Sequence, residues 1–460
     1  MGMGLGRSLI ASTLFLGMTA GVLAAPSDEI DELFREGVKL LRQHQDEKAL
    51  EKFKAILRQD PDNEAVYKLW RNSEESIWIR LLLKRGEYEK VAKAFISRAR
   101  VERKERMADE ELITGLVKDC LSDDFATRRQ AAIKLARDHG EFAVPALLEH
   151  LGNVDEEENQ LYAQVALIEM GPQAVLPLLE ALHTDNALLR RNIAIVLRRL
   201  GDERALPELK HLAATDEDAM VRKVAANAVD ALGGADAPAT ELFVARAQDF
   251  RDGKGIGRFE QGDVIWHWRD GALTFEKILS LVFPLEVARQ SAYKGLAAAP
   301  NNAAAKVEIA LSYLAERAAV AEQMAAGKTD EALVELNNRL LKSQVVVAAA
   351  GRDIMRRAAS RAVDQGDAFL CRMAFDALGR VENADSLASS PLLAALDHAN
   401  AIIRTEAALT VSELDPQGIA APAAKVANVL ADAANNRLVR LVVTMGLDTD
   451  ARNATEGIGR

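Results

Sequence analysis

The chain has 460 residues, a net charge of −11 and only 5% aromatic residues. This length accommodates two or three globular domains or one long array of repeats. Alanine and leucine are frequent while glycine and proline are sparse, so the composition favours packed helices over sheets. The acidic balance argues against nucleic acid as a partner, because a surface that follows phosphates needs clustered lysine and arginine.

Residues 1–24 have the layout of a secretory signal peptide. Arg7 precedes an apolar run from Leu9 to Ala25, and Val22 and Ala24 suit the −3 and −1 positions of a cleavage site. We therefore expect an exported protein, periplasmic or secreted. An uncleaved membrane anchor is the alternative, because the run is just long enough to be considered for a span. No later stretch is apolar for long enough to cross a bilayer, so no membrane span is expected after cleavage.

Residues 28–106 are predicted to form a helical region like that of tetratricopeptide (TPR) repeats. In such a repeat, small residues let two helices approach closely and a proline ends the unit. The residues at this spacing are Gly37, Ala49, Phe53, Ile56 and Pro61. A second set keeps the offsets of the last four, which predicts further TPR-like helices within residues 236–340. This second set is Ala288, Ala292, Gly295 and Pro300.

Residues 107–235 contain one sequence pattern four times, with a period of 30 to 32 residues. In each copy an acid is followed five residues later by an arginine or a glutamine, and eleven residues after that by a glycine. Apolar residues at helical spacing, a stopping glycine and a proline near the next start predict a helix, a tight turn and a second helix. The four pairs are Asp124 and Arg129, Asp155 and Gln160, Asp185 and Arg190, and Glu217 and Arg222.

This pattern resembles the HEAT repeats, in particular the short bacterial form labelled phycocyanobilin-lyase-like HEAT. The resemblance implies stacked helical hairpins in which the four acids and their partners form a structural ladder, with Gln160 as the departure. Residues 341–436 repeat the pattern in degenerate form, with Gly379 and Arg404 in the marker positions. We therefore predict an all-α fold, an α-solenoid of HEAT-like and TPR-like hairpins.

One small β-hairpin is expected near residues 263–276, because an alternating apolar run meets Asp270-Gly271, a type I′ turn signal. Trp266 and Trp268 share one face of the first strand, either as a plug between helical blocks or as a ligand platform. Residues 437–460 predict the start of an α/β domain, receiver-like or other, in which case the sequence is a truncated fragment, or else a short tail.

The predicted function is that of a non-enzymatic scaffold that binds a protein or peptide on its concave surface. No catalytic constellation, metal site, cofactor motif or small-molecule substrate site is evident. Second helices of HEAT arrays usually line the concave side, and Trp266 and Trp268 are the candidate aromatic anchors beside them. The polar residues predicted there are Glu149, His150, Glu180, Glu208, Lys210 and His211. Two alternatives stay open: an accessory or lyase-like factor for a bound cofactor, and the sensor part of a regulator whose receiver-like domain is truncated.

Overall fold

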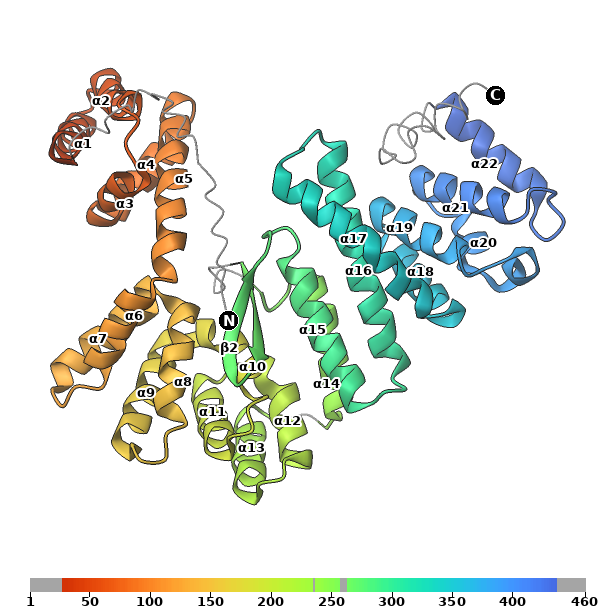
Figure 1. The fold of residues 1–460 in the computed structure, drawn as a ribbon. Coiled ribbons are helices and arrows are strands. Elements are labelled where there is room, and N and C mark those ends of the chain that lie inside the picture. Colours follow the sequence, from red (N-terminus) through yellow and green to blue (C-terminus); the bar gives the residue numbers. More distant parts are fainter. Residues whose placement is uncertain (1–26, 235, 257–262, 437–460) are drawn as a thin grey trace, which may run out of the picture. The chain divides into compact units, whose positions relative to one another are not determined.

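The computed structural model describes residues 27–234, 236–256 and 263–436. These residues form helices throughout, apart from one antiparallel β-hairpin (Figure 1). The predicted fold class, an all-α solenoid with a small β-hairpin, is therefore confirmed. The chain divides into two compact units, Met1–Met107 and Ala108–Arg460. The predicted signal peptide, residues 1–24, and the predicted start of an α/β domain, residues 437–460, lie outside the described residues.

The N-terminal unit packs its helices around a cluster of aromatic rings. The centroid of the Phe34 ring lies 5.7 Å from that of Phe53 and 5.4 Å from that of Trp78. At Gly37 an added Cβ would lie 2.8 Å from Cε1 of Phe53, so only glycine allows this close approach of α1 and α2. The helices are α1 (Ser27–Arg42), α2 (Asp46–Arg58), α3 (Asn63–Asn72), α4 (Glu75–Leu83) and α5 (Glu87–Met107).

The second unit begins with stacked helical hairpins, seen from orange through yellow to light green in Figure 1. Gly171 and Gly201 take positive φ angles of 65° and 69° where the first helices end, and Pro207 lies in the first turn of a second helix. The first helices are α7 (Phe125–Asp138), α9 (Glu157–Met170), α11 (Ala187–Leu200) and α13 (Ala219–Ala231). The helices paired with them are α6 (Glu110–Cys120), α8 (Val144–Leu151), α10 (Val175–Ala181) and α12 (Leu206–Thr215). A short 3-10 turn precedes each of α8, α10 and α12: η1 (Gly140–Ala143), η2 (Gly171–Ala174) and η3 (Glu203–Ala205).

The β-hairpin follows the helical repeats in the chain. Its strands pair with Val264 opposite Lys277 and Trp266 opposite Phe275. Asp270 and Gly271 both have positive φ, 54° and 79°, which is the backbone of the predicted type I′ turn. The elements of this region are α14 (Ala239–Arg251), β1 (Val264–Arg269), β2 (Ala272–Lys277), α15 (Phe283–Ala298), α16 (Ala303–Ala325) and α17 (Glu331–Ala349).

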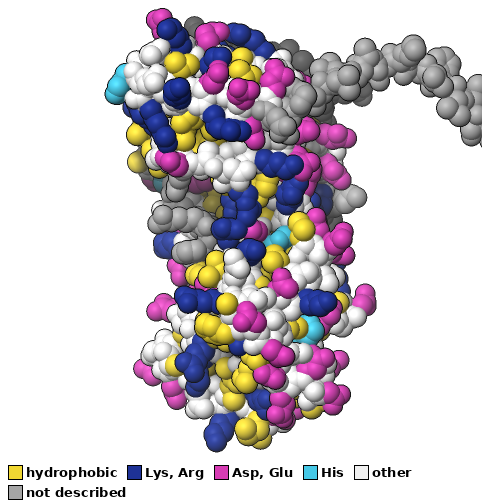
Figure 2. Space-filling view, turned by 90° about the vertical axis from the view of Figure 1, so that its left-hand side faces the viewer, with side chains coloured by type: hydrophobic (Ala, Val, Ile, Leu, Met, Phe, Trp, Pro, Cys, Tyr) yellow, Lys and Arg dark blue, Asp and Glu magenta, His cyan; other side chains and the backbone are white. Residues whose placement is uncertain are grey.

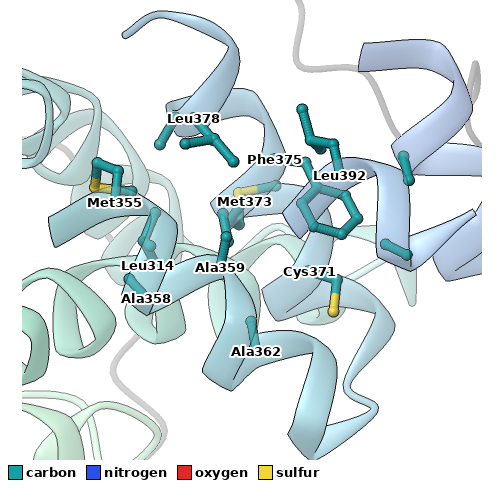
Figure 3. Close-up of a cluster of buried hydrophobic side chains, with 14 of the residues drawn as sticks. Leu314, Met355, Ala358, Ala359, Ala362, Cys371, Met373, Phe375, Leu378 and Leu392 are labelled. Atoms are coloured by element: carbon teal, nitrogen blue, oxygen red, sulfur yellow. The ribbon is translucent and has the colours of Figure 1, made fainter. Parts of the chain in front are cut away.

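The C-terminal block packs around the apolar cluster of Figure 3, where Phe375 lies among side chains from neighbouring helices. Gly379 corrects one expectation: it is the last residue of α19 rather than a left-handed stop, and an added Cβ would lie 3.2 Å from Cγ2 of Thr410. Close helix approach therefore explains this glycine. The elements are α18 (Arg352–Gln365), α19 (Ala368–Gly379), η4 (Ala384–Ser389), α20 (Pro391–Ala395), α21 (Ala401–Leu414) and α22 (Ala423–Asn435). Within the described ranges, no helix is both long and apolar enough to cross a membrane.

Candidate partner-binding surfaces

Four helices of the second unit begin with the same hydrogen bond, which we call the carbonyl tie. An arginine four residues after the N-cap donates from Nη1 to the backbone oxygen of the residue six positions before it. The donor–acceptor distances lie between 2.6 and 2.8 Å. The ties join Arg128 to Ser122, Arg190 to Thr184, Arg222 to Asp216 and Arg404 to His398. Each tie fixes the loop that leads into its helix.

The ties correct the register of the first predicted pair. Arg128, not Arg129, occupies the position of Arg190, while Arg129 is exposed. Asp124 is the N-cap of α7 and accepts a hydrogen bond of 2.8 Å from the Thr127 backbone N–H. Its carboxylate therefore completes the helix start and is not the ladder partner of Arg129.

The acids predicted to pair with these arginines along the stack are also corrected. Asp155, Asp185 and Glu217 are exposed. Arg190 instead makes a bidentate pair with Asp216, with Nε–Oδ2 and Nη2–Oδ1 distances of 2.7 and 3.0 Å. Burial alone would raise the pKa of Asp216, but the hydrogen bonds from Arg190 outweigh it and hold that pKa below its usual value. The Arg190–Asp216 pair thus links α11 to the loop before α13.

At the second repeat an amide network replaces the arginine. Gln160 is buried and donates from Nε2 to the Asn153 oxygen at 2.6 Å. Asn192 of the next first helix donates to Oε1 of Gln160 at 3.0 Å and to the Leu151 oxygen at 2.8 Å. Gln160, which departs from the arginine pattern of the sequence, therefore still binds the loop before its helix, but through an uncharged amide.

The predicted concave strip is largely covered by the chain itself. Glu208 on α12 is 6% exposed and pairs with Arg246 on α14 at 2.5 and 2.7 Å. Lys294 on α15 lies 2.7 Å from a Glu180 oxygen and 3.0 Å from a Glu208 oxygen. Burial opposes ionisation of Glu208, but the charges of Arg246 and Lys294 outweigh it and lower its pKa to about 2. Glu180 and Glu208 thus hold α14 and α15 in place and are not open to a partner.

The β-hairpin covers the neighbouring second helices. β1 and β2 pack against α10, and β2 also reaches α8 (Figure 1). Trp266 is 2% exposed, and its indole Nε1–H donates to Oε2 of the buried Glu141 at 2.6 Å. Its ring also lies 6.0 Å from that of Phe142 and 5.3 Å from that of Phe275. Trp266 therefore acts as a plug between helical blocks, and the predicted platform role is corrected. Trp268 is half-buried.

The other predicted strip residues have mixed exposure. Glu149 is exposed at the end of α8. His150 is half-buried, with Nδ1 3.0 Å from a Glu156 oxygen. Lys210 and His211 are half-buried on α12, and the His211 ring lies 6.4 Å from that of Phe243 on α14. These residues do not form one open surface with Glu180 and Glu208.

An open groove lies in the N-terminal unit, along α1 and against α3 and α4. We call it the α1 groove; its volume is about 540 Å³. Its apolar floor consists of Phe34, Val38, Leu69 and Ile77. Its rim carries Asp31, Arg35, Lys39, Arg42 and Glu74. Sequence reasoning missed this groove, although the i, i+4 spacing of Phe34 with Val38 and of Arg35 with Lys39 places apolar and cationic stripes side by side on one helix.

Charge alone does not mark a binding face on the surface drawn in Figure 2. Lysine and arginine side chains are interspersed there with acidic ones, and apolar side chains lie between them. Among the described residues, no group of three or more histidine, cysteine, aspartate or glutamate side chains is arranged to hold a metal ion.

A family model of HEAT repeats matches residues 144–230 and, in an overlapping match, residues 175–249. Residues 144–249 of this chain are HEAT repeats. Such repeats are helical scaffolds for protein interaction and are generally non-catalytic. No curated protein matches the chain.

HEAT geometry extends beyond the matched residues in one respect. The carbonyl ties of Arg128 and Arg404 lie on either side of residues 144–249, and both repeat the hydrogen bond of the matched helices. Arg222 and Arg404 each donate to two consecutive carbonyls, at 2.6 and 2.9 Å in both cases. The start of α21 therefore has the local geometry of a HEAT first helix.

Proposed function

We propose that the protein is an exported helical-repeat scaffold that holds a protein partner, and that the α1 groove binds an extended segment of this partner. The observation that carries the proposal is the contrast between two surfaces. The second helices of the HEAT repeats are largely covered by α14, α15 and the β-hairpin, whereas the α1 groove is open above an apolar floor. The signal-peptide layout of residues 1–24 supports export.

The groove favours a segment with an apolar side chain next to an acidic one. Phe34 and Val38 offer apolar surface at its floor. Arg35 and Lys39 are exposed above it, and neither belongs to an ion pair within the described residues. Arg42 is already paired with Glu74 at 3.0 Å. Arg35 and Lys39, two cations without an ion-pair partner among the described residues, lie beside a single acid, Asp31. They therefore complement a negatively charged segment.

Site-specific photo-crosslinking tests this proposal in cells that export the protein. A photoreactive residue at Lys39 is expected to give a discrete adduct, while the same residue at exposed Arg100 on α5 is not. Arg35→Glu is expected to remove the adduct without changing the melting temperature, because its side chain is exposed. Lys48→Glu makes the same charge change away from the groove and serves as the control. Equal adducts at both positions, or an adduct that survives Arg35→Glu, would refute the groove as the binding site.

A further inference from the structure

The C-terminal block contains a polar pocket of about 490 Å³ that none of the preceding roles uses. It lies between the first turn of α16, the middle of α18 and the start of α20. Its polar lining is Arg356, Arg357, Ser360, Arg361, Ser389 and Ser390. A volume of this size is in the range of small-molecule sites, and the lining is unusually cationic for a chain with a net negative charge.

Arg356 is held rigidly at one side of the pocket. Its Nε donates to the fully buried Glu382 at 2.5 Å, its Nη1 to Ser389 Oγ at 2.9 Å and its Nη2 to the Ser386 oxygen at 2.6 Å. A guanidinium carries five N–H donors, so two remain for a ligand. Its position is set before any ligand arrives, which reduces the entropy lost on binding.

The cations in the pocket outnumber the acids that neutralise them. Arg361 pairs with Glu308, but this buried carboxylate also accepts a hydrogen bond of 3.2 Å from Arg251. One carboxylate is thus shared by two arginines. Arg357 is exposed and belongs to no ion pair in the part of the chain that the structure describes. The pocket therefore keeps an excess of positive charge, even after Glu382 is assigned to Arg356.

The pocket also offers hydroxyl groups next to this charge. Ser390 Oγ accepts from the Leu392 backbone N–H at 3.3 Å, which leaves its own proton available as a donor. Ser360 is exposed, one turn along α18 from Arg356 and Arg357. Several guanidinium and hydroxyl donors that converge from different sides suit a tetrahedral oxyanion with more acceptor oxygens than a carboxylate has.

We propose that this pocket binds a phosphate group. The group can belong to a free phosphate ester or to a phosphorylated side chain, and both present the same oxygens to Arg356, Arg357 and Arg361. The proposal is independent of the α1 groove, because it concerns other residues in the other unit.

Titration calorimetry of the full chain at low ionic strength tests the proposal, with inorganic phosphate as the first probe. Saturable one-to-one binding is expected. Because a charge-assisted hydrogen bond is lost, Arg357→Gln is expected to weaken binding by about tenfold or more. Arg129→Gln removes an exposed arginine outside the pocket and is expected to leave affinity unchanged. Ser360→Glu, which adds a negative charge at an exposed position, is expected to abolish binding.

Two further probes distinguish the sources of the phosphate. Glycerol phosphate represents a free ester, and a phosphoserine peptide, compared with its unphosphorylated form, represents a modified protein. Tighter binding of either one supports the proposal and assigns the source. No saturable heat beyond that of chloride at matched ionic strength would overturn it. So would equal affinity of Arg357→Gln and Arg129→Gln for phosphate, with all variants melting at the wild-type temperature.

Discussion

The ion pair that fixes α14 to the HEAT repeats can be tested with a change that keeps its shape. Glu208→Gln preserves the size of the side chain and removes its charge. Arg246, which is 8% exposed, then stays buried without its bidentate acceptor, and Lys294 keeps only Glu180. Removal of one partner from a buried ion pair costs about 3–5 kcal/mol in unfolding free energy. The pKa of Glu208, lowered from 4.5 to about 2, gives a consistent value of about 3 kcal/mol.

The same pKa fixes the sign of the pH dependence. A carboxyl group with a depressed pKa in the folded state stabilises the fold fully above its unfolded pKa, and this stabilisation is lost as pH falls. The stability difference between wild type and Glu208→Gln is therefore expected to be constant above about pH 5 and to shrink as the pH falls from about 4.5 toward about 2.

Urea unfolding, combined with hydrogen exchange of peptides from α14 and α15, measures this difference. Glu149→Gln is the matched control, because Glu149 is exposed on a second helix, and it is expected to change stability by less than about 0.5 kcal/mol. A double variant, Glu208→Leu with Arg246→Met, is expected to recover most of the loss, since two apolar side chains leave no buried charge unpaired. Equal effects of Glu208→Gln and Glu149→Gln, or a difference independent of pH, would refute the reasoning.

Three further outcomes are expected. Arg190→Ala should lower the unfolding free energy by about 2–3 kcal/mol, because it removes a mostly buried bidentate pair. Arg129→Ala should lower it by less than about 0.5 kcal/mol, because this side chain is exposed, and similar losses for both variants in denaturant titrations would contradict the corrected register. Gly37→Ala should destabilise the N-terminal unit by about 1–3 kcal/mol through its contact with Phe53, and thermal melting that does not change would argue against this close approach. N-terminal sequencing of the exported protein should begin at Ala25, and a product that retains the first residue would favour the membrane anchor.

Local signals predicted local structure well. Gly201 and Pro207 mark a helix end and the next start because a left-handed stop and an N-terminal proline depend on the backbone of one turn only. Asp270 and Gly271 predicted their turn for the same reason. Arg128 and Arg129 each follow an acid by five residues, so the spacing alone does not separate them and only the position of the N-cap, Asp124, decides.

Contacts with residues far away in the sequence bury the acidic residues of the predicted binding strip, and the sequence contains no comparable signal for such contacts. Arg246 and Lys294 are 38 and 86 residues away from Glu208, in a segment predicted only as TPR-like helices. An acidic residue on a repeat helix has the same local pattern whether it faces solvent or a docked helix. The burial of Glu180 and Glu208 therefore becomes visible only when α14 and α15 are placed.

The carbonyl tie has a consequence for how such repeats can change over time. Its acceptor is a main-chain oxygen, which every amino acid supplies, and in the four ties the accepting residues are Ser122, Thr184, Asp216 and His398. A substitution at the acceptor position can therefore preserve the bond, whereas loss of the arginine removes it unless another donor takes its place, as Gln160 does in the second repeat. Loop side chains with no other role are therefore free to diverge, whereas Asp216 is also held through its carboxylate pair with Arg190. An engineer who recombines or inserts units would need to keep the arginine, or an amide in its place as at Gln160, together with loop acids such as Asp216, and could choose the other loop side chains to suit a new ligand.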